Sequence, residues 1–245
     1  MKEELYIINA NIDNLTSLWK TASMPYGSYF SESIFSYSYI NNSDWPNRLW
    51  LNQDVDKEII SSIKDEILSI SVPLIVPYWD IYENNLYKDL ELQGFTKTFE
   101  QVGMSLKIGK PLRINNYLEI RLVSNNSEAK LWADIFKKSF GYRIHPKTIL
   151  MTKSKINYYI ASSQNQPVGT GISYKTNKIL GVHSVGIPPE MRRKGYAEQI
   201  MKLLINLAVE EGVDYMTLQA SDMGKNLYLK LGFEEQFVIK NYKLQ

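Results

Sequence analysis

Residues 188–212, PPEMRRKGYAEQIMKLLINLAVEEG, restrict the possible folds of this chain more than any other segment. A basic turn with one glycine leads here directly into an amphipathic helix pattern, which ends at Gly212. The apolar residues at helical spacing are Ile200, Leu203, Leu204, Leu207 and Ala208. The segment ILGVHSVGI (179–187) precedes the turn and reads as a strand. The sequence therefore predicts a strand, a turn and a helix in succession.

Other strand and helix patterns surround this unit. Strands are predicted at 117–123, 157–162, 167–175, 215–220 and 233–244, and helices from Ser127 to Phe140, at 146–152 and at 224–231. Ser127 is a residue type that favours a helix N-cap, and Gly141 favours a helix end. The three strands between residues 157 and 187 are separated by short polar turns, which favours an antiparallel meander. The predicted fold class is α+β, a mixed α/β domain.

The first 108 residues give a weaker copy of the same order of elements. Residues 47–51 and 73–79 are predicted strands, and residues 56–70 a helix between them. Four pairs of residues in LQGFTKTFEQVGMSL (92–106) and KLGFEEQFVIKNYKL (230–244) match at one offset: Gly94 with Gly232, Phe95 with Phe233, Phe99 with Phe237 and Leu106 with Leu244. This repeat predicts two tandem domains, residues 1–110 and 116–245, joined near residues 109–116.

The turn Arg192-Arg193-Lys194-Gly195-Tyr196-Ala197 has the chemistry of an anion site. The first turn of a helix presents unpaired backbone N–H groups and the positive end of the helix dipole. A glycine lets the backbone approach a phosphate closely, and the cations attract it. On these six residues alone, a solvated basic turn is an equally good interpretation.

Composition and missing motifs exclude other classes of site. There is no GxxxxGK[ST] segment, and Tyr174 stands where a dinucleotide fingerprint beginning at Gly169 needs its third glycine. The chain has no cysteine, and His145 and His183 are far apart, so a metal centre is not expected. A net charge of +2 gives no general nucleic-acid signal. The N-terminus has no signal-peptide pattern and no segment has membrane-spanning character, so we expect a cytoplasmic protein without a membrane partner.

The turn and a second motif together resemble the GCN5-related N-acetyltransferase (GNAT) superfamily. Its signature Q/R-x-x-G-x-G/A is matched by residues 192–197, and its LY-x-K-L-G-F segment by residues 227–233. The resemblance covers residues 117–245 and only the tail of residues 1–108. It implies a central, mostly antiparallel twisted sheet flanked by helices, and acetyl-CoA as cosubstrate without a metal. Several members of the superfamily are tandem duplications in which one half has lost the cofactor site.

The resemblance also implies roles for particular residues. The backbone of Val185, Gly186 and Ile187 would bind the acetyl oxygen and the pantetheine arm, and Tyr228 would protonate the departing thiolate. Ser221 stands where many relatives have an asparagine that contacts pantetheine. The predicted coenzyme-binding residues are Val185, Gly186, Ile187, Arg192, Arg193, Lys194, Gly195, Tyr196, Ala197, Ser221 and Tyr228.

The general base is not given by the motifs. Some relatives carry a glutamate four residues before the backbone donor, but Gly181 stands there in this chain. His183 lies on the same face of the predicted strand as Val185 and titrates in a useful range, so it is the candidate base, acting through a water. A structural role for this histidine is the alternative.

The first half lacks the corresponding cofactor loop. Its strand-to-helix turn, residues 52–57, has no glycine and carries Asp54 and Asp56 where phosphates would lie. We expect this half to shape the acceptor pocket with the tyrosine-rich segment 28–40, although these tyrosines could equally fill core and surface.

The sequence thus predicts an acetyl-CoA-dependent N-acetyltransferase that acts on a small-molecule or peptide amine, as a monomer or homodimer and without nucleic acid. The alternative is a catalytically silent acyl-CoA-binding or regulatory module, favoured by the missing glutamate.

Overall fold

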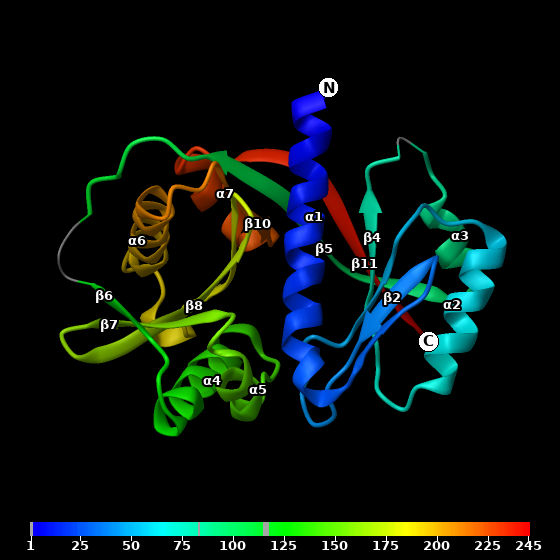
Figure 1. The fold of residues 1–245 in the computed structure, drawn as a ribbon, viewed down its shortest axis with the longest axis horizontal. Helices are drawn as coiled ribbons and strands as arrows, with labels where there is room; N and C mark the ends of the chain where they lie inside the picture. Colours follow the sequence, from blue (N-terminus) through cyan, green and yellow to red (C-terminus); the bar gives the residue numbers. More distant parts are fainter. Residues whose placement is uncertain (1, 83, 115–117) are drawn as a thin grey trace.

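The computed structural model describes residues 2–82, 84–114 and 118–245, which form two β-sheets with helices packed on them (Figure 1). The larger sheet has eight strands in the order β4-β11-β5-β10-β9-β8-β7-β6, and the smaller has the order β1-β2-β3. The strands are β1 (Tyr29–Ser31), β2 (Phe35–Ser38), β3 (Arg48–Leu51), β4 (Val76–Asp80), β5 (Phe95–Lys107), β6 (Glu119–Leu122), β7 (Asn157–Ser163), β8 (Gln166–Thr176), β9 (Ile179–Gly186), β10 (Tyr215–Ala220) and β11 (Glu234–Leu244).

Most of the predicted elements are confirmed. The helices are α1 (Lys2–Ser23), α2 (Lys57–Ser69), α3 (Tyr87–Leu92), α4 (Asn126–Phe140), α5 (Pro146–Thr152), α6 (Tyr196–Glu210) and α7 (Asp222–Lys230). The predicted N-cap of α4 was wrong, because Asn125 accepts the backbone N–H of Glu128 at 3.0 Å and the helix already includes Ser127. Asn115 and Asn116 of the predicted junction, and Tyr117 of the next strand, lie outside the described residues.

Helix α1 was not predicted, and it runs along the middle of the molecule (Figure 1). Its buried stripe contains Ile7, Leu15 and Leu18, but also Asn11 and Asn14, which are fully buried. These asparagines interrupt the apolar periodicity that identifies a helix in a sequence. They donate to backbone carbonyls of the sheet, Asn11 to Met104 at 3.1 Å and Asn14 to Tyr174 at 2.9 Å.

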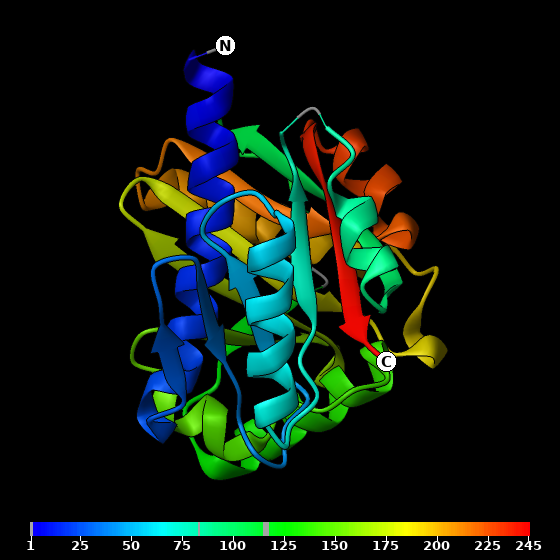
Figure 2. The same ribbon diagram turned by 90° about the vertical axis from the view of Figure 1, so that its right-hand side faces the viewer.

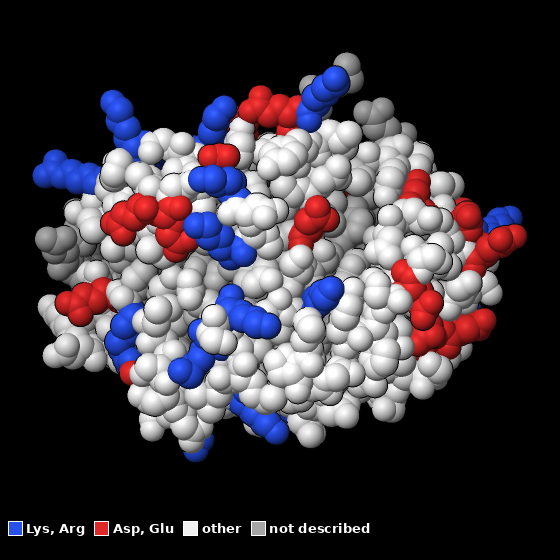
Figure 3. Space-filling model, viewed as in Figure 1, with Lys and Arg blue, Asp and Glu red and all other residues white. Residues whose placement is uncertain are grey.

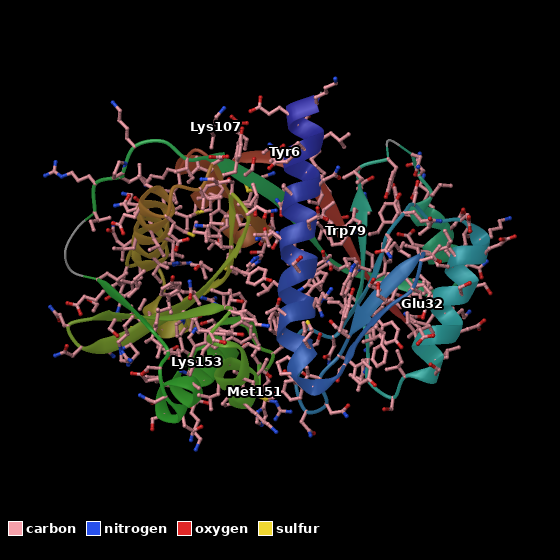
Figure 4. All side chains as sticks on the ribbon, in the orientation of Figure 1. Tyr6, Glu32, Trp79, Lys107, Met151 and Lys153 are labelled. Carbon is pink, nitrogen blue, oxygen red and sulfur yellow. The ribbon has the colours of Figure 1, made fainter. Side chains whose placement is uncertain are left out.

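Three groups of buried side chains hold the layers together. The first joins α1, α4 and α5 to one face of the large sheet, and the second joins α6 to the other face. The third lies in the first half, between α2, β2, β3 and β4. Trp79 belongs to the first group and lies beside α1, where its ring stacks on Trp19 with centroids 6.4 Å apart (Figure 4).

The final strands of the two halves exchange places in the large sheet. Strand β5, from the first half, lies between β10 and β11, and β11, from the second half, lies between β4 and β5. Figure 2 shows β4 and β11 side by side. The sheet is mostly antiparallel as predicted, and within its described strands β9 and β10 form the parallel pair.

The repeated segments have matching local geometry. Gly94 ends the turn after α3 with φ 94°, and Gly232 ends the turn after α7 with φ 92°, both in the region that favours glycine. In the β5–β11 ladder, pairing passes over Thr98 on one strand and Gln236 on the other. The difference between 236 and 98 is 138, as it is between 232 and 94. The bulge and the glycine thus recur at one common offset.

Charge is distributed unequally between the two halves. Residues 1–110 contain 15 acidic and 9 basic residues, whereas residues 111–245 contain 11 acidic and 19 basic residues. In Figure 3 acidic side chains gather at the right-hand edge, around α2. An anionic ligand is therefore attracted to the second half more than to the first.

Candidate active site

The site begins where β9 and β10 separate. They pair in parallel only from Ile179 to Gly181, opposite Tyr215 to Thr217, although β10 continues to Ala220. The register between β8 and β9 shifts by one residue between His183 and Gly186, and Ser184 has φ 54°. This bulge turns the end of β9 away from its neighbour. A cleft of about 1960 Å³ opens at this place.

The N-terminus of α6 opens into this cleft. Gly195 is the N-cap residue, with φ 79° and ψ 3°, and it has no side chain that could cap the first turn. Arg193 also has a positive φ, 63°. Both residues line the cleft together with Tyr196 and Ala197. The predicted anion site therefore lies at the wall of the cleft, with an N-cap residue that leaves room for a ligand.

The three cations of the turn differ in their surroundings. Arg192 braces the turn, because its guanidinium donates to the backbone carbonyls of Ile187 and Ser139, each at 3.1 Å. Arg193 is exposed and lines the cleft. Lys194 is exposed but is not among the lining residues, and its Nζ lies 3.9 Å from Met191 Sδ.

The end of β9 is packed closely against the C-terminal end of α4. Val185, Gly186 and Ile187 all line the cleft. A Cβ atom added to Gly186 would lie 2.4 Å from the ring of Phe140, so only glycine allows this approach. The predicted backbone-donor segment and the aromatic ring of Phe140 therefore share one wall.

Tyr228 and Ser221 come from α7 and the residue before it, on the opposite side of the cleft. Tyr228 packs against Phe233, with ring centroids 5.8 Å apart, and burial raises its pKa to about 12. Its hydroxyl has no hydrogen-bond partner among the described residues, and Ser221 is exposed with no capping bond from its side chain. Tyr228 is thus protonated at neutral pH and free to donate a hydrogen bond into the cleft.

His183 lines the cleft but is held by other side chains. Its Nδ1 lies 3.0 Å from Gln219 Oε1 and its Nε2 lies 3.2 Å from Asn14 Oδ1. Gln219 in turn donates to Asn11 at 2.6 Å, which fixes the orientation of its amide. Burial lowers the pKa of His183 to about 4, and the bond to Gln219 opposes this change. The imidazole is therefore neutral at pH 7, and both of its nitrogens face amide oxygens.

The absence of a glutamate at position 181 has a structural cause. A Cβ atom on Gly181 would lie 1.8 Å from Asn14 Oδ1 and 2.6 Å from His183 Nε2. Helix α1 thus occupies the space that a side chain at this position would need. Asn14 of α1 contacts His183 directly, and Asn11 contacts it through Gln219.

The tyrosine-rich segment 28–40 is not among the lining residues, in contrast to the expectation. Phe35 and Tyr37 are buried in the core of the first half instead. The first half reaches the cleft through Leu15 and Trp19 of α1 and through residues within 42–48, 71–75 and 99–102, with Trp45 and Arg48 among them. Arg48 was not among the predicted site residues; a basic residue at the start of the apolar strand NRLWL was the available signal.

The second half of the chain matches a known family. Residues 127–233 match the model of the Acetyltransferase (GNAT) family. This segment is a GNAT acetyltransferase domain. The chain is accordingly an acyltransferase, and its uncapped helix N-terminus and separated strands lie inside the matched segment.

Solved structures extend the likeness in fold to the whole chain. A GCN5-related N-acetyltransferase from Kribbella flavida has a TM-score of 0.70 at 13% identity, over 95% of both chains. One from Sphaerobacter thermophilus has a TM-score of 0.65 at 14% identity, over 86% of this chain and 76% of its own. A GCN5-related N-acetyltransferase-like protein from Streptococcus suis has a TM-score of 0.57 at 14% identity, over 98% of this chain and 99% of its own. No protein with a curated description matches the chain.

The donor set of the cleft fits a coenzyme with phosphate groups. Gly195 and Arg193 offer backbone in left-handed conformations at a helix start without a capping side chain on its N-cap residue, and the turn is basic.

The described residues contain no group of three or more His, Asp or Glu side chains arranged to hold a metal ion. In the described part of the chain, none of the helices has the length and apolarity required to cross a bilayer.

Proposed function

We propose that this chain transfers the acetyl group of acetyl-CoA to a primary amine of a small molecule or peptide. The observation that carries the proposal is the uncapped N-terminus of α6, which opens into the same cleft as the free hydroxyl of Tyr228. The turn at residues 192–197 would hold the diphosphate, and acetyl-CoA would supply the acyl group as a thioester. The backbone of residues 185–187 would orient the acetyl oxygen.

Tyr228 is the proposed acid. A pKa of about 12 keeps its phenol protonated over the working range, so that it can donate a hydrogen bond to the leaving sulfur. Tyr228→Phe should lower kcat by about 100-fold and leave acetyl-CoA affinity unchanged. Tyr6→Phe, on the exposed face of α1, is the matched control and should have no effect. An unchanged kcat in Tyr228→Phe would remove this role.

His183 is the sequence-based candidate for the proton acceptor. In the structure it could accept a proton only after its bond to Asn14 or to Gln219 opens. If His183 is the base, kcat/KM should fall as the pH drops toward its pKa near 4, and His183→Gln should abolish turnover with acetyl-CoA affinity retained. Turnover in His183→Gln with an unchanged pH profile would assign the histidine a structural role.

The same site would also suit an acyl-CoA-binding module without turnover. The observation that favours this second function is Gly181, where α1 leaves no room for a carboxylate. The two functions are separated by measuring free thiol release from acetyl-CoA with a panel of amines, using the full chain. Release that depends on the amine supports the transferase, whereas tight acetyl-CoA binding without amine-dependent release supports the silent module.

We also propose that the chain is a tandem duplication, with residues 1–110 as a degenerate copy of residues 116–245. The recurring glycine and bulge at an offset of 138 residues support this division. The proposal assigns the coenzyme grip to the second copy alone.

A further inference from the structure

Arg48 is a cation that the fold holds rigidly at the wall of the cleft. It is the first residue of β3 and pairs with Ser38 of β2 on one side. On the other side it forms a parallel bridge with Ile75, and Leu49 donates to the Ile75 carbonyl at 3.0 Å. The Cα position of Arg48 is therefore fixed by strands on both sides, and its side chain lines the cleft.

The guanidinium of Arg48 has few partners of its own. Its Nη1 donates to the Asn47 carbonyl at 2.9 Å, and the group lies 5.9 Å from the centroid of the Trp19 ring. Among the described residues, no ion pair includes Arg48. Burial lowers its pKa, but a guanidinium remains charged in a protein. A largely enclosed positive charge without a carboxylate partner is costly unless a ligand supplies one.

A continuous row of aromatic rings links Arg48 to the predicted acetyl site. Gly186 lies against Phe140, and the Phe140 ring lies 6.1 Å from that of Tyr142. Tyr142 in turn lies near enough to Arg48 for the guanidinium to lower the pKa of its phenol, although burial raises that pKa more strongly. Arg48 is thus connected to the predicted backbone-donor segment through the rings of Phe140 and Tyr142.

The other charged side chains of the first half, with those of residues 143 and 243, indicate what kind of anion fits near Arg48. Asp44 and Glu100 line the cleft together with Arg143 and Lys243. The Asp44 carboxylate accepts the backbone N–H of Arg143 at 2.7 Å, and Glu100 pairs with Lys97 at 2.7 Å. With Arg48, these lining side chains are three cations and two carboxylates, a net charge of +1, which a singly charged carboxylate neutralises and a doubly charged phosphate exceeds. A planar guanidinium also matches a carboxylate with two parallel hydrogen bonds.

We propose that Arg48 binds a carboxylate of the acceptor, so that the acceptor is an α-amino acid or a similar amine with a carboxylate close to its nitrogen. This inference rests on the proposed transferase function and names its substrate class. Trp19, Trp45, Phe140 and Tyr142 line the same part of the cleft. An acceptor with an aromatic or branched apolar side chain therefore finds apolar surface beside the cation.

The first test compares acceptors that differ in charge but not in size. Phenylalanine and leucine are assayed against their primary carboxamides, by free thiol release from acetyl-CoA with the wild-type chain. The carboxylates should have a KM about 10- to 100-fold lower, the range expected when a hydrogen-bonded charge pair is lost. Equal KM values for acid and amide, with turnover present, would overturn the inference and leave the transferase proposal intact.

Variants connect the preference to Arg48. Arg48→Gln should raise KM for the amino acids to that of the amides, with kcat and acetyl-CoA affinity unchanged, whereas Arg48→Lys should retain part of the preference. Arg113→Gln removes an exposed arginine outside the lining residues and should behave as wild type. Reduced acetyl-CoA affinity in Arg48→Gln, or a preference that survives it, would contradict the assignment. Failure of the wild-type chain to bind acetyl-CoA would instead refute the proposed function.

Discussion

Under the proposed tandem division, the N-termini of α2 and α6 occupy corresponding positions, and their N-cap residues differ in kind. At α2, Asp56 is the N-cap and its carboxylate accepts the backbone N–H of Ile59 at 2.8 Å. At α6, Gly195 occupies the N-cap position and has no side chain to do so. The N-cap residue of α2 thus supplies its own anion, whereas the N-cap residue of α6 supplies none. We propose that the coenzyme diphosphate takes this place at α6.

Asp54 strengthens this contrast. It accepts hydrogen bonds from Asn84 at 2.6 Å and from Tyr78 at 3.1 Å, which tie the first-half turn to β4 and the loop after it. In the second half the corresponding turn is basic and faces the cleft. The first half contributes to the wall of the cleft through α1 and through residues within 42–48, 71–75 and 99–102, and not through its own turn at residues 52–57.

Removing the first half tests how far the two halves depend on each other. A chain of residues 112–245 lacks β5, the strand between β10 and β11, and lacks α1 on the sheet. We expect loss of cooperative unfolding, because β11 would lose its neighbour and the apolar face would be exposed. The measurement is thermal unfolding followed by circular dichroism. A sigmoidal transition in this fragment would show that the second half folds alone.

The contact between α1 and β9 is tested by Gly181→Ala. The added Cβ would lie 1.8 Å from Asn14 Oδ1, and Asn14 is fully buried, so the free energy of unfolding should fall by about 2 kcal/mol. Gly171→Ala on the neighbouring strand is the control, since its Cβ would meet nothing closer than 3.7 Å. Urea titration of both variants decides the question. Equal stability of the two would mean that α1 does not press on β9.

His183 should make the stability of the chain depend on pH. Its folded-state pKa of about 4 lies below the ordinary value of 6.5, so the unfolded chain binds the proton more tightly. The contribution of His183 to the free energy of unfolding is complete above pH 6.5 and is lost as the pH falls toward 4. We expect this contribution to be about 1–2 kcal/mol, less than the full pKa shift implies, because part of the ring faces the open cleft. His183→Gln should flatten the urea-derived stability between pH 7 and pH 4; an unchanged slope would contradict burial of the neutral ring.

Asp56→Ala produces the smallest of these effects. Loss of the N-cap bond should reduce the free energy of unfolding by about 1 kcal/mol, with no change in acetyl-CoA affinity. Chemical denaturation and calorimetric titration measure the two quantities separately. A change in affinity would mean that the start of α2 also contacts the coenzyme.

Much of the second half could be predicted from its sequence because its helices are amphipathic and its strands are separated by polar turns. The long α1 could not, since Asn11 and Asn14 are placed in its buried stripe by partners more than 90 residues away. The exchange of β5 and β11 also escaped prediction, because pairing between distant strands leaves no local pattern. The basic turn at residues 192–197 is local, so a candidate anion site is visible in the sequence, whereas the position of Arg48 at the cleft depends on distant parts of the fold.

The most direct test of the contrast between the two helix starts is calorimetric titration of acetyl-CoA into the wild type, Gly195→Glu and Gly212→Glu. Gly212 follows the other end of α6, also with a positive φ, and a Cβ there meets nothing within 4 Å, so this variant controls for strain and charge. We expect binding at about micromolar Kd to the wild type and to Gly212→Glu, and none to Gly195→Glu. Equal binding to all three proteins, or no binding to the wild type, would contradict the proposed coenzyme site at the start of α6.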